Sequence, residues 1–415
     1  MRSVGTRPAL LLPFLLLLAL VGCTPATPAP APLGTLKIGV LVPFTEASID
    51  SDIGASQRRA ADLYLKLKGG KLAGREVQLV YNDESALDPG TNKLRIQQFL
   101  EQDHVELLLG GAGDPAAYLL RATAETAKVI YLVSNASGNA LTRSPAGCTP
   151  SCKSRLVFRT APSAWQLSEP LGEWAARNGQ KDFSLVYADN DFGTETAAGF
   201  AEGLAKSGGV AVTRTAVPVM SGASWPKIIA ALKAQPAKNV FAAFATDDAE
   251  GFVAAWGAAG MRAAGYRLFG PGPLAGDQVL TATKQAGLGI ISAFPWSREL
   301  GEAENQSFVT EFKKAYTDDA TGQPLAPDGY AVQMWDAMHV LEDALKTTKG
   351  DVKGTDAFIA ALEAVSFRGP GGPFTFDRAT HNPVRDIYIR EVRASGASLT
   401  NMVIDKIAGV TDPGR

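Results

Sequence analysis

The chain has 415 residues, of which 46% are hydrophobic, and its 40 basic and 42 acidic side chains give a formal net charge of −2. This balance argues against a nucleic-acid-binding surface, and no basic run interleaved with aromatic residues suggests one. The ~390 residues that follow the N-terminal segment exceed the usual size of one domain, so we expect two lobes.

The first residues, 1–22, predict a signal peptide. Two arginines precede an almost unbroken apolar run over residues 9–21, which is too short to span a bilayer comfortably. The run ends in Leu20-Val21-Gly22-Cys23, which resembles the bacterial lipobox, whose cysteine is acylated and becomes the new N-terminus. We therefore expect Cys23 to carry lipid and the Pro/Ala-rich residues 23–35 to form an extended tether. The alternative is an ordinary signal peptide with an incidental cysteine.

The other two cysteines, Cys148 and Cys152, stand close together in Cys-Thr-Pro-Ser-Cys. Disulfides persist outside the cytoplasm, so we expect a local disulfide between them. The alternative, a metal site, is disfavoured because the three histidines are scattered and none lies near the pair. The sequence predicts neither a metal nor a cofactor.

From residue 36 onward, short apolar β-branched runs alternate with helical patterns, which predicts βαβ units and parallel sheets. The expected elements of the first half are strands at 36–43, 77–81, 105–109, 129–133 and 156–159, and helices at 53–67, 91–101 and 115–127.

The same alternation restarts after residue 160. The expected elements are helices at 163–177, from 193, and at 248–259, and strands at 183–187, 210–217, 240–244 and 266–269. Residues 303–366 read as helical, with one apolar core stripe, and residues 372–406 read as rich in strands. The stripe comprises Ala331, Met334, Trp335, Met338, Leu341 and Leu345. The fold class is therefore α/β with two doubly wound parallel-sheet lobes, and their carboxyl strand ends predict a crevice.

Catalytic motifs are not found. Residues 111–116 fit G-x-G-x-x-A, but they follow the third strand, no acidic residue follows some 20 positions later, and Asp114 would repel a phosphate. We interpret this segment as a tight turn with Asp114 as N-cap and Pro115 at the first helical position. No nucleophile elbow, zinc-protease motif or P-loop is present, so we do not expect an enzyme.

Five segments, in this order and spacing, carry a resemblance to the branched-chain amino-acid-binding (Leu/Ile/Val-binding-like) type of periplasmic binding protein, with type I topology. They are Lys37-Ile-Gly-Val-Leu-Val-Pro43, Leu72-Ala-Gly-Arg-Glu-Val-Gln-Leu-Val-Tyr-Asn-Asp83, Val157-Phe-Arg-Thr-Ala-Pro-Ser163, Tyr187-Ala-Asp-Asn-Asp-Phe-Gly193 and Gly372-Pro-Phe-Thr-Phe-Asp377. The resemblance extends from residue 36 to about residue 392.

The resemblance implies a hinge of three crossings, near Thr160, Phe294-Pro295 and Gly372-Pro373. The first lobe would then comprise 36–160 plus 295–372, and the second 161–294 plus 373–415. Ligand would stabilise the closed form, which an ABC permease distinguishes from the open one. We expect a monomer outside the cytoplasm, anchored to the cell membrane by its N-terminal lipid alone.

The ligand-binding residues that we expect are Asp114, Asn135, Ser137, Trp165, Phe192, Phe244 and Thr246. The first three match first-lobe positions that meet ligand in relatives, and the aromatic residues would line a slot. Two alternatives stay open: the aromatic residues pack in the core, or Asp114 only caps its helix. Relatives that bind leucine also place an acid where this chain has Gly272.

These departures disfavour a free branched-chain amino acid, because Asp114 would oppose its carboxylate and Gly272 would leave its ammonium unpaired. We expect a small amino acid, amide, cationic, hydroxylated or aromatic ligand that is delivered to a transporter. The alternatives are a sensory module of the same fold, for which no extra signalling domain or transmembrane helix is evident, and a secreted enzyme.

Overall fold

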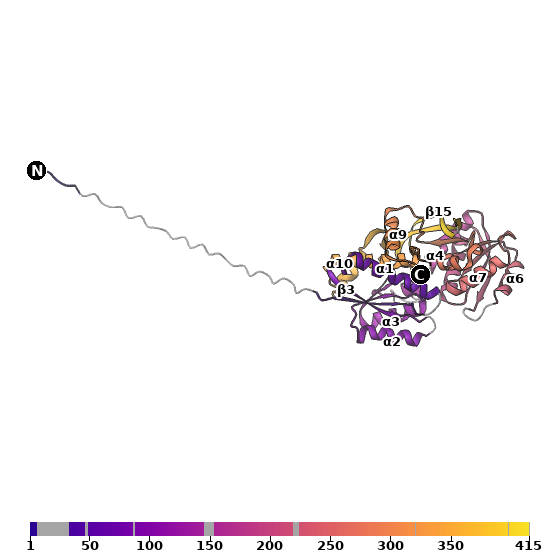
Figure 1. Cartoon of the computed structure of the whole chain (residues 1–415), viewed down its shortest axis with the longest axis horizontal. Coiled ribbons are helices and arrows are strands. Elements are labelled where there is room, and N and C mark those ends of the chain that lie inside the picture. The colour runs from indigo at the N-terminus through magenta and orange to yellow at the C-terminus, as the bar shows by residue number, and fades with distance from the viewer. Residues whose placement is uncertain are drawn as a thin grey trace. The chain divides into compact units, whose positions relative to one another are not determined.

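The structure is a computed structural model that describes residues 1–5, 33–45, 49–85, 88–144, 153–218, 224–319, 321–396 and 398–414. The chain divides into residues 1–33 and a compact unit spanning Gly34–Arg415, whose elements are labelled in Figure 1. Cys23, Cys148 and Cys152 lie outside the described residues, so lipidation and the disulfide stay predictions. Within the described part, no helix combines the length and apolarity needed to span a membrane.

The first sheet has six strands in the order β2-β3-β1-β4-β5-β6, parallel except for the β2–β3 hairpin. Its strands are β1 (Leu36–Val42), β2 (Lys71–Leu72), β3 (Arg75–Asp83), β4 (Leu107–Gly110), β5 (Ile130–Val133) and β6 (Val157–Arg159). Side chains alternate between its two faces: Leu107 and Leu109 enter one apolar core, and Leu108 enters another. Both faces are therefore buried, as a parallel sheet requires.

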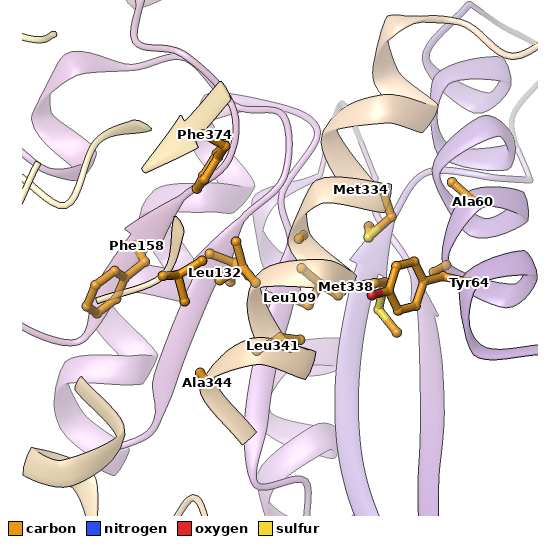
Figure 2. Close-up of a cluster of buried hydrophobic side chains, with 14 of the residues drawn as sticks. Ala60, Tyr64, Leu109, Leu132, Phe158, Met334, Met338, Leu341, Ala344 and Phe374 are labelled. Atoms are coloured by element: carbon orange, nitrogen blue, oxygen red, sulfur yellow. The ribbon is translucent and has the colours of Figure 1, made fainter. Parts of the chain in front are cut away.

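Helices cover both faces of this sheet, and together they form the first lobe. The helices are α1 (Ile49–Leu67), α9 (Ala303–Ala315), α10 (Gly329–Thr348) and α11 (Thr355–Glu363) on one core, and α2 (Pro89–Glu101) and α3 (Asp114–Ala127) on the other. The predicted stripe of α10 is confirmed as core. Met334, Met338 and Leu341 are buried against α1 and the sheet, and Trp335 is partly buried beside them (Figure 2).

The second lobe is built on a nine-stranded sheet in the order β12-β13-β14-β11-β10-β9-β7-β8, with β15 paired to β14. Its strands are β7 (Asp182–Ala188), β8 (Val210–Val217), β9 (Asn239–Ala243), β10 (Arg267–Pro271), β11 (Ile291–Phe294), β12 (Ser366–Gly369), β13 (Gly372–Phe376), β14 (Pro383–Ser395) and β15 (Ser398–Val410). Its helices are α4 (Ala164–Arg177), α5 (Asp191–Lys206), α6 (Trp225–Lys233), α7 (Thr246–Ala258) and α8 (Asp277–Thr283). The fold class of two α/β lobes with mostly parallel sheets is confirmed.

Some elements differ from the predictions. The sequence did not predict β2, α6, α8, β11 or β12, and the stretch 303–366, predicted to be helical, contains the three helices α9, α10 and α11. β2 has two residues, and β11 and β12 have four each. The structure places β11 as the partner of β10 and β14 in the middle of the second sheet.

The three predicted crossings meet around one buried arginine. Arg385 on β14 donates from Nη1 to the carbonyl of Thr160 (3.3 Å), and its Nη2 lies 3.1 Å from Oδ2 of Asp336 on α10. Gly371 approaches both the Arg385 guanidinium and the Pro295 carbonyl so closely that a Cβ there would lie 2.4 and 2.6 Å from them. The residue limits of the lobes given above stay a prediction.

Candidate functional site

The first wall of the site is the turn that joins β4 to α3. Gly110 and Gly111 have φ values of 116° and 79°, and a Cβ on Gly110 would lie 2.2 Å from the Leu41 carbonyl, so only glycine fits there. The helix begins at Asp114 with Gly113 as its N-cap, so the prediction that Asp114 itself caps α3 is wrong. Instead, Oδ1 of Asp114 accepts a hydrogen bond from the backbone N–H of Gly138 (2.8 Å).

The backbone amides at this turn already donate to a side chain of the protein, that of Glu84. The backbone N–H groups of Ala112 and Gly113 donate to the two carboxylate oxygens of Glu84, at 2.8 and 2.7 Å. Glu84 is buried, and burial raises its pKa to about 8 although the two amides oppose the shift. The anion-binding end of α3 is therefore already filled by a side chain of the protein.

The loop after β5 supplies the two other first-lobe residues of the prediction. Asn135 donates from Nδ2 to the Ala112 carbonyl (2.8 Å), which fastens this loop to the start of α3. Ser137 is buried, and its carbonyl accepts from the backbone N–H of Ala164 (2.8 Å). The structure thus brings Asp114, Asn135 and Ser137 together at the carboxyl ends of β4 and β5.

A buried arginine, Arg159, holds this loop in place through hydrogen bonds to its carbonyl groups. Arg159 has no exposed surface and donates to four carbonyl groups: those of Ala136, Gly138, Ala161 and Pro162. Burial raises the pKa of Asp114, and it outweighs the opposing effects of the Gly138 amide and of the Arg159 charge. Asp114 is thus a half-buried acceptor that takes up a proton more readily than an exposed aspartate.

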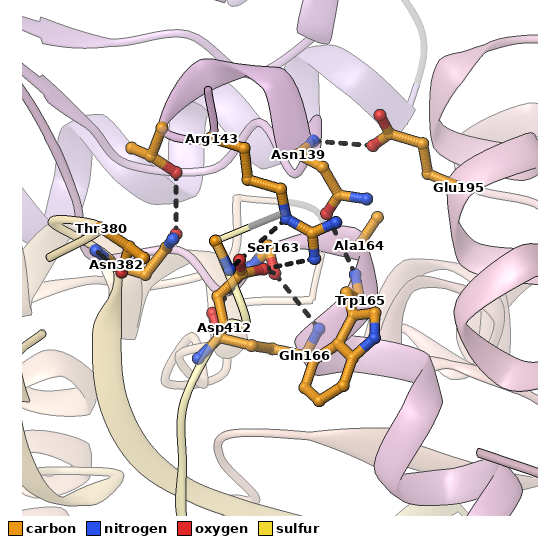
Figure 3. Close-up of polar contacts among 12 residues, drawn as sticks. Asn139, Arg143, Ser163, Ala164, Trp165, Gln166, Glu195, Thr380, Asn382 and Asp412 are labelled. Atoms are coloured by element: carbon orange, nitrogen blue, oxygen red, sulfur yellow. Dashed lines mark hydrogen bonds and ion pairs between the residues drawn. The ribbon is translucent and has the colours of Figure 1, made fainter. Parts of the chain in front are cut away.

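The second lobe contacts this wall through α5. Oε2 of Glu195 accepts from the backbone N–H of Asn139 at 2.7 Å, a hydrogen bond between the lobes (Figure 3). Burial raises the pKa of Glu195 to about 7, and the charges of Asp114 and Asp191 act in the same direction. This end of the site is acidic and offers hydrogen-bond acceptors.

Two predicted residues of the second lobe begin helices on this side. Phe192 lies in the first turn of α5, is half-buried, and packs against none of the four apolar cores of the described chain. Thr246 is the first residue of α7 and has a φ of 50°. A β-branched residue in this left-handed region is strained, and such strain gathers at functional sites.

The rings of the other two predicted aromatic residues lie elsewhere, although the backbone N–H of Trp165 donates to Oδ1 of Asn139 (3.3 Å). Phe244 is fully buried in a second-lobe core, with its ring centroid 5.2 Å from that of Trp225 and 5.1 Å from that of Phe252. Trp165 donates from Nε1 to Glu202 (3.2 Å), 11 residues along α5 from Asp191, so its indole lies on the outer part of that helix. The structure does not bring these two rings to the wall formed by Asp114, Asn135 and Ser137.

A second contact between the lobes lies near α8. Nε2 of Gln278 on α8 donates to Oδ2 of Asp328 (2.6 Å), which begins α10 and also accepts from Ser56 of α1 (2.7 Å). Helix α1 also contacts α7 and α8. The hydrogen bonds Asn139 to Glu195 and Gln278 to Asp328 thus join the two lobes. We use the name interlobe site for the predicted residues that follow carboxyl strand ends in the two lobes: Asp114, Asn135, Ser137, Phe192 and Thr246.

The position where leucine-binding relatives carry an acid is closed by an aromatic ring. A Cβ on Gly272 would lie 2.1 Å from the Phe294 ring, and one on Gly329 would lie 2.2 Å from the opposite side of that ring. The guanidinium of Arg390 lies 5.0 Å from the centre of the same ring. Gly272 is therefore glycine because Phe294 takes the space.

Sequence reasoning missed Glu84, Glu195 and Arg390. A glutamate inside a helix, such as Glu195, carries no recognisable signal, and an arginine in a strand is expected at the surface. The position of Glu84 one residue after β3 was the available signal, because residues at carboxyl strand ends gather at one sheet edge.

The sequence matches the periplasmic binding protein family over residues 35–397. It is 27% identical over 381 residues to the Leu/Ile/Val-binding protein homolog 6 of Brucella suis biovar 1, covering 91% of this chain and 93% of that one. The structure superposes on that of a solute-binding protein of an ABC transporter from Rhodopseudomonas palustris BisB5, which is in complex with 3,4-dihydroxybenzoic acid. The TM-score is 0.81 and the sequence identity 29%, and the superposition covers 92% of this chain and 99% of the other. A solute-binding protein of R. palustris in complex with benzoate gives a TM-score of 0.78 at 29% identity, over 90% and 98% of the two chains.

Proposed function

The chain belongs to the periplasmic binding protein family, and on that premise we propose that it binds a small hydroxylated aromatic compound between its lobes and delivers it to an ABC permease. The observation that carries the ligand class is the interlobe site itself. Asp114 is a half-buried acceptor, Phe192 is a ring that packs against no core, and no acid stands at position 272 to pair with an ammonium.

Three features support a ligand other than a leucine-like amino acid. Glu84 holds the α3 amides that would otherwise suit a carboxylate, and Asp114 beside them would repel one. Two solved relatives with 29% identity are complexes with 3,4-dihydroxybenzoic acid and with benzoate. A phenolic hydroxyl can donate to Asp114, and an aromatic ring can stack on Phe192.

Thermal unfolding of the purified full chain against a ligand panel tests this proposal. At a hundred times its dissociation constant a ligand adds about 2.7 kcal/mol to stability. We expect 4-hydroxybenzoate or 3,4-dihydroxybenzoate to give a saturable shift, and leucine and valine to give none. A shift with leucine and none with the aromatic acids would contradict the proposed ligand class.

Asp114→Asn tests the role of this acceptor. The variant should lose much of the preference for hydroxylated over unsubstituted benzoate, because an amide is a weaker acceptor for a phenol than a carboxylate is. Asp88→Asn is the matched control, because Asp88 also lies at a helix start, capping α2, but stands outside the interlobe site. Equal preference in Asp114→Asn and the wild type would remove Asp114 from the ligand contacts.

The proposal includes an extracytoplasmic monomer held at the membrane by lipid on Cys23. Its supports are the apolar run and the Leu-Val-Gly-Cys motif of the sequence. Cys23→Ala should move the protein from the membrane fraction to the soluble fraction of the cell envelope. We also propose that Cys148 and Cys152 are joined, so the unfolded, unreduced chain should show no free thiol from this pair.

A further inference from the structure

A narrow pocket lies beside the Gln278–Asp328 contact, and Asp328 forms part of its wall. Its wall includes Gly272, Phe294, Trp296, Tyr330, Arg390 and Asn401. Gly272 directly follows β10, and Thr246 follows the neighbouring strand β9 by three residues, so the pocket opens at the same carboxyl edge of the sheet. The free space suits a group of about the size of one water molecule.

Arg390 is a buried cation with unused donors in this pocket. It is 4% exposed, and it donates to the Ser292 hydroxyl from Nε (3.3 Å) and Nη2 (3.1 Å) and to the Trp296 carbonyl from Nη1 (2.9 Å). A guanidinium has five N–H groups, so two remain. Among the residues that the structure describes, no carboxylate forms an ion pair with it. Burial lowers the pKa of Arg390 to about 10, and the charge of Asp277 opposes this shift.

The other charged groups of the pocket are already engaged. Asp277 forms an ion pair with Arg298 at 2.8 Å. Asp328 accepts from Ser56, from Gln278 and from the backbone N–H of Ala331. Arg298 also keeps two N–H groups beyond its bonds to Asp277 and Pro327, but its charge is already paired and its side chain is 25% exposed. Arg390 is the buried cation here without an ion-paired carboxylate among the described residues, and such a cation is costly.

We propose that this pocket is an anion subsite in which Arg390 binds one oxygen of the ligand carboxylate, while the rest of the ligand lies outside the pocket. The inference rests on the proposed function, because it names the group by which an aromatic acid would be held. Glu84 fills the α3 amides, so the acidic end of the site accepts hydroxyl donors while Arg390 receives one carboxylate oxygen in the pocket. The Phe294 ring beneath the guanidinium supplies an apolar surface for the carbon next to that carboxylate.

Calorimetric titration with benzoate and benzamide tests the subsite, because the two differ mainly in charge at the group that Arg390 would meet. Oδ1 of Asn401 in the pocket wall accepts no hydrogen bond in the described structure. The N–H groups of benzamide could donate to this oxygen, so benzamide is a stringent competitor of benzoate. The wild type should prefer benzoate by about tenfold, equal to about 1.4 kcal/mol. Arg390→Met, which keeps an unbranched side chain without charge, should abolish that preference, and Arg390→Lys should keep part of it.

Arg75→Met is the matched control. Arg75 is also a buried arginine, but it pairs with Glu106 far from the pocket, so this variant should lose stability and keep the benzoate preference. An unchanged preference in Arg390→Met, or a preference of the wild type for benzamide, would overturn the proposal. If Arg390→Met does not fold, an undiminished preference in Arg390→Lys would overturn it instead, because an ammonium lacks the planar, fixed N–H donors of a guanidinium.

Acetate separates this inference from the proposed function. If the wild type binds neither aromatic compound, the proposed ligand class is wrong, and thermal unfolding in acetate against chloride at equal ionic strength still examines the pocket. The subsite predicts a saturable rise in melting temperature with acetate for the wild type and for Arg75→Met, and no rise for Arg390→Met. Equal responses of all three proteins would exclude Arg390 as the anion site.

Discussion

Arg385 and Asp336 form an ion pair at 3.1 Å while their side chains are 1% and 0% exposed. Arg385 belongs to β14 of the second lobe and Asp336 to α10 of the first, so the pair connects the lobes through the point where the three crossings meet. Burial raises the pKa of Asp336 to about 6 even though Arg385 opposes the shift. The predicted hinge region therefore contains a buried ion pair in which removal of either member would leave the other charge unpaired.

Removing one member of this pair should be severe. Asp336→Ala leaves Arg385 buried without an anion, and we expect a loss of about 3–5 kcal/mol in the free energy of unfolding. Urea denaturation measures it. Asp356→Ala is the control, because Asp356 pairs with Arg155 at 2.8 Å on the exposed surface, where the expected cost is below about 1 kcal/mol. Similar losses in the two variants would contradict the special weight given to the hinge pair.

Glu84 should make stability depend on pH. Its pKa is raised from 4.5 to about 8 on folding, so between these values the folded chain binds more protons than the unfolded one. Its contribution to stability is then largest below pH 4.5 and is lost as the pH rises toward 8, by up to about 1.4 kcal/mol for each pH unit in between. The difference in stability between wild type and Glu84→Gln should fall with rising pH across this window in denaturation experiments. A difference that stays constant from about pH 5 to about pH 8 would contradict the burial of an ionisable Glu84.

The Asn139–Glu195 hydrogen bond should favour the closed form. Glu195→Ala removes an interlobe bond worth about 1 kcal/mol, so the ligand should bind about fivefold more weakly. Isothermal titration with whichever compound stabilises the wild type measures this change. Glu202→Ala on the same helix is the control, because its partner Trp165 belongs to the same lobe. Equal losses in both variants would point to a general effect on α5 rather than to closure.

Replacing Thr246 by glycine should raise the stability of the protein and lower its affinity for the ligand. Thr246→Gly relieves a strain of about 1–3 kcal/mol at a φ of 50°, against a cost of about 1 kcal/mol for glycine, so we expect a net gain in stability of about 1 kcal/mol. Ligand affinity should fall, because the hydroxyl and the fixed backbone are lost together. Thr194→Gly in α5 serves as control and should lower stability instead, because Thr194 is not among the residues with positive φ. A stabilised Thr246→Gly with full affinity would show that the strain serves no ligand.

The sequence predicts regular elements well because periodicity records which face is buried. The α10 stripe became core, and β1, α3, α4 and β8 lie within two residues of their expected bounds. It could not separate aromatic residues of the core from those of the site, because Phe244 and Phe192 each stand at the junction of a strand and a helix and differ only in what surrounds them. The buried arginine Arg390 could not be predicted either, because its acceptors Ser292 and Trp296 are more than 90 residues away in the chain.

The ring of Phe294, held between Gly272 and Gly329, also constrains how this protein can evolve. An acidic side chain at position 272 cannot be gained alone, because its first carbon would overlap the ring. Phe294 would have to become small first, which opens a void in the core and costs about 3–5 kcal/mol. A change toward an ammonium-binding specificity therefore has to cross an unstable intermediate, and the order of the two substitutions is dictated by packing.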